Sequence, residues 1–66
     1  MKNSIKVERA RHDMTQAELA ERVRVSRQTI NAIETGKFVP STVLALKIAK
    51  VFNIKVEEVF ELEEGD

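Results

Sequence analysis

The chain has 66 residues, with 11 Lys and Arg, 11 Asp and Glu, one His and no Cys. That length allows one domain, which buries only about 60% of its unfolded surface and is therefore marginally stable. The composition excludes disulfides, thiolate metal sites and histidine-rich metal sites. Small folds usually need such an additional stabilising element, and the one that remains here is a partner subunit. No long apolar run and no signal-peptide pattern occur, which predicts a soluble, cytoplasmic protein without membrane contact.

The net charge of zero hides an uneven distribution along the chain. Residues 1–40 hold eight basic and five acidic side chains, whereas residues 41–66 hold three basic and six acidic ones. A basic half and an acidic half indicate that one side of the molecule faces a polyanion. Ordinary surface charge would explain the same numbers, so the distribution alone does not decide the function.

The sequence predicts two helices in the first part of the chain, and only the second has a clear capping signal at its start. Residues 4–12 are expected to form the first, with Ile5, Val7 and Ala10 facing the core. The second begins after Thr15, which forms a capping box with Glu18 three residues later. Its inward stripe at helical spacing consists of Leu19, Ala20 and Val23.

The third helix repeats this design. Ser26 is its expected N-cap, and Gly36 stands where a left-handed residue would end it. Ile30 and Ile33 are expected to face the core. The polar residues near its start, expected to face outward, are Arg27, Gln28 and Thr29.

A fourth helix is predicted from Ser41 to Phe52, with Asn53 as its C-cap. Its apolar residues spread too widely for a one-sided surface helix, which predicts the central element of the core. These residues are Val43, Leu44, Leu46, Ile48, Ala49, Val51 and Phe52. A fifth helix over 56–60 and a frayed acidic tail over 61–66 complete the chain, with a short strand over 59–62 as an alternative.

Residues 15–36 have the layout of a reading helix on a supporting helix. A helix enters the DNA major groove only if its outer face lacks bulky apolar residues and a second helix holds it in place. The outer face of the third helix is polar, and the small Ala20 allows two helices to cross closely.

These segments resemble the Cro/repressor-type (XRE-like) helix-turn-helix family. The matching segments are QAELA at 16–20, VSRQTI at 25–30, IETGK at 33–37, PS at 40–41, LALKIA at 44–49 and VEEVF at 56–60. The resemblance covers nearly the whole chain and is specific as a set. It implies an all-α, compact five-helix bundle of the lambda-repressor-like type, a single DNA-binding domain over 1–66 that usually acts as a dimeric transcriptional regulator.

Two positions depart from the family pattern. Arg24 stands in the turn between the second and third helices, where the family usually has Gly. A non-glycine residue in a left-handed turn costs about 1 kcal/mol, which is tolerable. In the first helix, Glu8 occupies a position that is usually apolar, which leaves the packing of that helix open.

The reading helix supplies the expected base contacts. Arg27 can pair bidentately with guanine and Gln28 with adenine, while Thr29 and Asn31 are nearby helpers that touch bases or phosphates. The alternative for Arg27 is a solvated surface charge. We therefore expect Arg27, Gln28, Thr29 and Asn31 to face DNA bases.

A second group is expected to contact the DNA backbone. Gln16 begins the second helix, where free N–H groups and the positive end of the dipole favour a phosphate, as the family resemblance also implies. Ser26 is mainly a cap and a secondary backbone contact. Lys37, just past the third helix, and Arg24 are the expected phosphate-binding cations.

The resemblance implies a structural ion pair between Arg9 and Glu34, which orients helices rather than catalysing a reaction. The homodimer is inferred from the small size, the wide apolar face of the fourth helix and apolar residues near the acidic end. Val59, Phe60 and Leu62 are the candidate interface, through packing or edge-strand pairing.

Catalysis is not expected, because one histidine, His12, cannot assemble a nucleophilic triad and no glycine-rich phosphate loop occurs. No metal, cofactor or small-molecule ligand is predicted. The expected partner is double-stranded DNA, bound in the major groove by a homodimeric repressor on a two-fold-symmetric operator. An antitoxin or adaptor that binds a partner protein with the same fold is the alternative, and a purely structural module ranks last.

Overall fold

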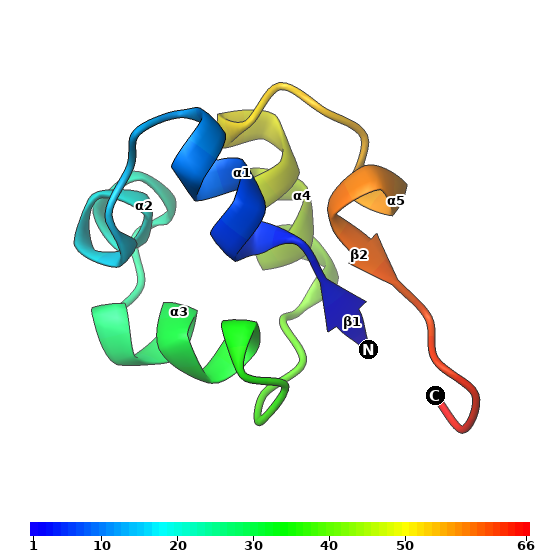
Figure 1. Cartoon of the computed structure of the whole chain (residues 1–66). Helices are drawn as coiled ribbons and strands as arrows, with labels where there is room; N and C mark the ends of the chain where they lie inside the picture. Colours follow the sequence, from blue (N-terminus) through cyan, green and yellow to red (C-terminus); the bar gives the residue numbers. More distant parts are fainter.

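Five short helices and a two-stranded sheet form the molecule (Figure 1), a computed structural model that describes all of residues 1–66. In chain order the elements are β1 (Lys2–Asn3), α1 (Ile5–Arg11), α2 (Gln16–Val23), α3 (Arg27–Glu34), α4 (Thr42–Val51), α5 (Val56–Val59) and β2 (Phe60–Glu61). The predicted helical fold is confirmed, and the fifth helix ends one residue earlier than expected.

Side-chain caps fix the starts of the three longest helices. The capping box before α2 is present, since Glu18 N donates to Thr15 Oγ1 at 3.0 Å and Thr15 N donates to Glu18 Oε1 at 3.1 Å. Ser26 accepts from Thr29 N before α3, and Ser41 accepts from Leu44 N before α4. These caps satisfy N–H groups that a helix leaves unpaired, so each start is decided locally.

Left-handed residues end the same helices. Arg24 has φ of 62° at the end of α2, Gly36 has φ of 77° after α3, and Asn53 has φ of 56° after α4. All three positions agree with the sequence prediction. Of these three residues, only Arg24 is neither glycine nor asparagine. Its left-handed backbone conformation costs about 1 kcal/mol of folding free energy.

The core is a single cluster built mainly on α4, which packs against α2 and α5. Its fully buried side chains include Ile5, Leu19, Ile30, Ile48 and Phe52. The expectation that the whole apolar set of α4 is buried is wrong: Val43 is 63% exposed and Leu46 is 53% exposed. The neighbouring helices cover one side of α4 only, and both residues lie on the other side.

Helix α1 uses a different inward face from the one expected. Ile5 is fully buried, but Val7 and Ala10 are exposed and Glu8 is buried instead. Positions 5 and 8 are one turn apart on the same helical face, whereas position 7 lies away from them. The Glu8 carboxylate pairs with Arg11 Nη1 at 3.1 Å, which compensates its burial.

The two ends of the chain lie together (Figure 1), through an antiparallel pairing of β1 and β2 that the sequence analysis missed on the β1 side. Lys2 pairs with Glu61 and Asn3 with Phe60. Val59, the last residue of α5, and Phe60, the first residue of β2, are 2% and 8% exposed, because both side chains belong to the core of the monomer. This corrects the expectation that these two side chains face a partner; Leu62 is 76% exposed.

Candidate nucleic-acid interface

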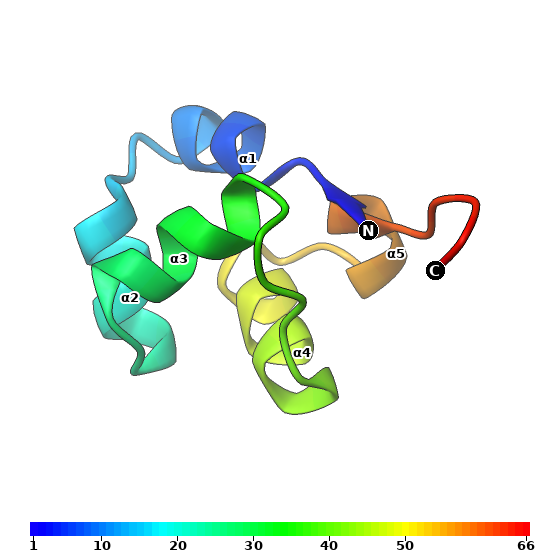
Figure 2. The same cartoon turned by 90° about the horizontal axis from the view of Figure 1, so that it is seen from below.

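Helix α3 lies along the lower side of the molecule in Figure 1 and faces the viewer in Figure 2. Ile30 and Ile33 anchor it, with exposures of 0% and 1%. Arg27, Gln28 and Asn31 occupy its opposite, exposed face. One helix thus combines a fixed apolar underside with a polar outer surface, as insertion into a major groove requires.

Helix α2 supports α3 from the side. The two helices pack directly on one another, and Ala20 in α2 is only 3% exposed. A small side chain at a helix crossing lets the two backbones approach closely. The turn between the two helices is short and consists of Arg24, Val25 and Ser26.

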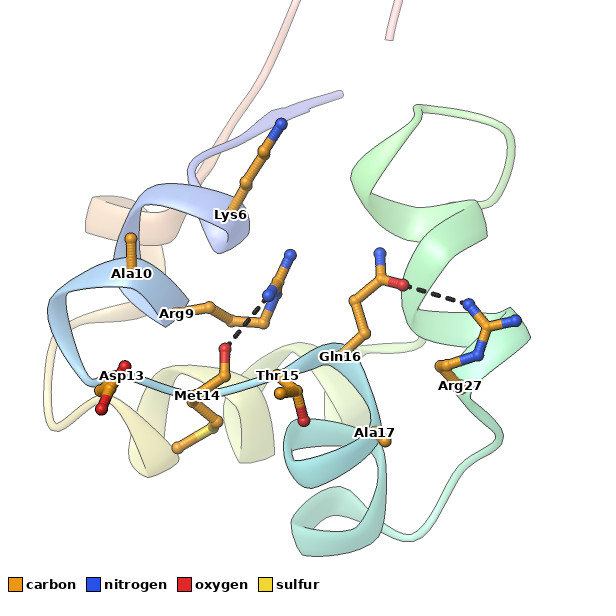
Figure 3. Close-up of a pocket in the computed structure, with 9 residues that line it drawn as sticks. All are labelled: Lys6, Arg9, Ala10, Asp13, Met14, Thr15, Gln16, Ala17 and Arg27. Atoms are coloured by element: carbon orange, nitrogen blue, oxygen red, sulfur yellow. Dashed lines mark hydrogen bonds between the residues drawn. The ribbon is translucent and has the colours of Figure 1, made fainter.

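The Gln16 side chain connects the start of α2 to the outer face of α3. Its Nε2 donates to Asn31 Oδ1 at 3.2 Å and to Glu34 Oε1 at 3.3 Å. Its Oε1 accepts from Arg27 Nη1 at 3.3 Å, the contact drawn in Figure 3. Two residues expected to read bases, Arg27 and Asn31, are therefore held by one residue expected to contact the backbone.

Behind this network, the structure brings Arg9 and Glu34 together. Arg9 Nε donates to Glu34 Oε2 at 2.8 Å and Nη2 donates to Oε1 at 3.0 Å, while Nη1 donates to the Met14 carbonyl at 3.1 Å. The hydrogen bonds with Glu34 raise the pKa of Arg9 above its already high ordinary value. This bidentate pair ties α1, the loop before α2 and the end of α3 into one unit.

An open depression of roughly 570 Å³ lies between α1 and the start of α2 (Figure 3). Lys6, Arg9 and Arg27 line it, and the backbone N–H groups of Gln16 and Ala17 find no partner within the chain. Free N–H groups and nearby cations favour an anion such as a DNA phosphate. The sequence analysis missed Lys6, although its spacing of three from Arg9 places both cations on one face of α1.

The other residues expected to contact DNA differ in their exposure and in whether they already have a partner within the chain. Arg24 and Lys37 are exposed, and neither forms an ion pair. The Ser26 hydroxyl is occupied as a cap and lies 2.9 Å from the Thr29 hydroxyl. Thr29 is half-buried, so it does not face outward as freely as predicted.

Asn3 is a further residue that sequence reasoning did not single out. Its Nδ2 donates to the Ile33 carbonyl at 2.9 Å, and its Oδ1 accepts from Ile5 N at 3.2 Å. It therefore attaches the start of the chain to the last turn of α3. The only local signal was an asparagine just before a helix, a pattern that also occurs in ordinary caps.

The described residues contain no group of three or more His, Cys, Asp or Glu side chains placed to hold a metal ion. None of the helices has the length and apolar character needed to cross a membrane.

The reading helix, its supporting helix and the tight turn between them define a helix-turn-helix domain. A helix-turn-helix family model matches residues 5–59. An uncharacterised HTH-type transcriptional regulator of Methanocaldococcus jannaschii is 53% identical over 66 residues, covering 100% of both chains. The uncharacterised HTH-type transcriptional regulator YgzD of Bacillus subtilis is 56% identical over 64 residues, covering 97% of each. The chain belongs to the XRE-type helix-turn-helix family and is a DNA-binding transcriptional regulator, not an enzyme.

Two solved structures resemble the fold at 27–28% sequence identity. The clp gene regulator ClgR of Corynebacterium glutamicum aligns with a TM-score of 0.77 over 82% of this chain and 57% of the solved chain. The SOS-response transcriptional repressor LexA of Eubacterium rectale aligns with a TM-score of 0.79 over 94% of this chain and 66% of the solved chain. The alignment thus covers about two thirds or less of each of these two solved chains.

Proposed function

We propose that the protein is a sequence-specific repressor that binds a two-fold-symmetric operator as a homodimer. The observation that carries this proposal is the outer face of α3, where Arg27, Gln28 and Asn31 are exposed above a fully buried apolar underside. A dimer would place two such helices in successive major grooves about 34 Å apart. Occupation of a promoter by the dimer would exclude polymerase.

In this proposal Arg27 and Gln28 read bases, with Asn31 beside them and Thr29 in a lesser role. Gln16, Ser26, Arg24 and Lys37 contact the backbone. Support comes from the free N–H groups at the start of α2 and from the exposed, unpaired state of Arg24 and Lys37. The Gln16 contacts support a pre-ordered surface, since Arg27 and Asn31 are already positioned before DNA binds.

The comparisons support two further parts of the proposal, the role as a repressor and the location in the cytoplasm. The similar LexA is named as a transcriptional repressor. The relatives come from archaea and bacteria, where the chromosome lies in the cytoplasm. A DNA-binding regulator of this kind therefore works in that compartment.

Selection from a random pool of DNA duplexes, with purified protein at near-physiological salt, tests the proposal. We expect recovery of a two-fold-symmetric motif. The double variant Arg27→Ala, Gln28→Ala is the matched control: both side chains are exposed, so the variant should keep the fold and recover no motif. If the unmodified protein recovers no motif and shows only weak, salt-sensitive binding, the repressor proposal fails and a partner-dependent antitoxin or adaptor role replaces it.

A further inference from the structure

The basic hollow is an open depression of roughly 350 Å³ between the C-terminal end of α2 and the outward side of α4. Its lining consists of Arg22, Arg24, Lys47 and Lys50 together with Val23 and Val51. No acidic residue lines it, and none of its four cations forms an ion pair within the chain. These four charges are therefore all available to a ligand.

This concentration of positive charge is not a consequence of the overall composition. The chain has equal numbers of basic and acidic residues, yet four of its 11 Lys and Arg line this one hollow. Lys47 and Lys50 are one helical turn apart on α4, where two like charges repel each other. The repulsion opposes folding, and an anion between the cations would relieve it. The basic hollow thus has the charge pattern of an anion site.

We propose that the basic hollow binds phosphate groups of duplex DNA that flank the base pairs contacted by α3. The inference rests on DNA binding in the proposed function and adds a second contact surface to it. Each nucleotide contributes one negative charge, so a strand offers a regular run of phosphates to several cations at once. Such contacts strengthen binding and fix the position of the protein on the duplex without reading its sequence.

Continuity with the reading helix favours DNA as the source of these phosphates. Arg24 lines the basic hollow and lies in the turn that leads from α2 into α3 (Figures 1 and 2), three residues before Arg27. A DNA strand that passes beside the start of α3 can therefore continue through Arg24 to the hollow. The hollow is also open to solvent, which suits an extended strand, whereas sites for small ligands enclose most of the ligand surface.

Neutralising one cation on each wall tests the proposal, with the double variant Arg22→Gln, Lys47→Gln. Both side chains are exposed and glutamine is a good helix former, so circular dichroism should show a folded protein. Each lost phosphate contact should reduce the slope of log affinity against log salt by about 0.9, hence about 1.8 for the two. At about 0.1 M salt the affinity for DNA should fall by at least about tenfold. Fluorescence anisotropy at several salt concentrations measures both quantities.

Two matched variants separate a local contact from a change of net charge. Lys2→Gln, Lys55→Gln removes the same total charge from two exposed lysines outside the basic hollow, and it should leave the slope unchanged. Arg22→Lys, Lys47→Arg keeps both charges in the hollow and should bind like the unmodified protein. Equal losses in the neutralised variant and the Lys2, Lys55 variant would overturn the proposal, because the effect would then be one of net charge.

The length of the duplex tests the position of the contact. The two duplexes compared are one that ends at the selected motif and one extended by about 10 base pairs, one helical turn, at each end. The unmodified protein should bind the longer duplex at least about fivefold more tightly, because only that duplex carries the flanking phosphates. The Arg22→Gln, Lys47→Gln variant should bind both duplexes equally. Equal binding of both duplexes by the unmodified protein would overturn a contact with the flanks.

Inorganic tripolyphosphate is the probe that separates a free phosphate ligand from DNA. If the neutralised variant loses tripolyphosphate binding in calorimetry but keeps its DNA affinity and salt slope, the hollow is a small-ligand site and the proposal fails. Failure of the proposed function gives a different result, since selection from random duplexes would then recover no motif. The same comparison of salt slopes on a random-sequence duplex would still decide whether the basic hollow contacts DNA.

Discussion

Helices α3 and α4 start in the same way and are used differently. Each follows a serine N-cap, Ser26 or Ser41, and each buries an apolar face with a fully buried isoleucine, Ile30 or Ile48. Their outer faces differ: α3 presents Arg27 and other polar groups, whereas α4 presents the apolar Val43 and Leu46 among its exposed lysines. The comparison shows that the inward face makes the helix part of the fold, while the outward face decides what the helix can bind.

The hydrogen-bond networks sharpen this contrast. On the α3 side, Gln16 is hydrogen-bonded to Arg27 and Asn31, and the Arg9–Glu34 pair lies behind them. On the α4 side, Lys50 has no charged partner and Leu46 has no covering element. A pre-ordered polar surface suits recognition of bases, whereas an uncovered apolar one suits association with another folded chain.

The largest expected effect lies on the inward faces. Ile30→Ala and Ile48→Ala should each lower the free energy of unfolding by about 2–5 kcal/mol, because each removes a fully buried side chain. Gln28→Ala, on the exposed face of α3, should change it by less than about 0.5 kcal/mol. Urea unfolding measures all three variants. Equal losses for Ile30→Ala and Gln28→Ala would contradict the assignment of the two faces of α3.

The pair behind the reading face comes next. Glu34→Ala should destabilise by about 3 kcal/mol, because it leaves the largely buried Arg9 guanidinium without its carboxylate. The double variant Arg9→Met, Glu34→Leu should recover most of that loss, since two apolar side chains leave no charge uncompensated. Thermal unfolding of both variants provides the comparison. A double variant as unstable as Glu34→Ala would show that the pair is needed for more than charge compensation.

On DNA, the outward face of α3 should carry the specificity. Arg27→Ala or Gln28→Ala should cost about 1–3 kcal/mol at the operator and relax the preference at one base pair each. Fluorescence anisotropy on operator and random duplexes measures this difference. An equal loss on both duplexes would refute base reading by that residue.

Lys37→Ala should have a smaller and less selective effect. Loss of one phosphate contact should weaken binding to all sequences alike and reduce the slope of log affinity against log salt by about 0.9. A titration series over several salt concentrations measures the slope. An unchanged slope would remove Lys37 from the backbone contacts.

The smallest expected effect concerns the cap that starts the supporting helix. The Thr15 backbone N–H donates to Glu18 and lowers the pKa of that carboxyl below its ordinary value. A lowered folded-state pKa gives stability that is present above the unfolded value of about 4.3 and is lost as the pH falls through the folded value. Glu18→Gln should therefore flatten part of the acid dependence of unfolding. An acid profile of Glu18→Gln identical to that of the unmodified protein would contradict the cap assignment.

Local signals in the sequence determined where most of the helices begin and end. The capping box at Thr15 and the left-handed residues Arg24, Gly36 and Asn53 act through atoms only a few residues away. A short pattern can therefore predict them. The inward residues of α2 and α3 were also predictable, because helical spacing alone assigns them to one face.

Only the tertiary structure decided which faces are covered. The side-chain spacing of α4 predicted a buried helix, yet Leu46 remains exposed because no other element reaches that side. In α1 the sequence offered Val7, but the chain buries Glu8 with Arg11 on its carboxylate. Such outcomes depend on which elements pack against one another in space. Contacts between residues far apart in the chain, such as the hydrogen bond between Asn3 and Ile33, produce no periodic pattern in the sequence that could predict them.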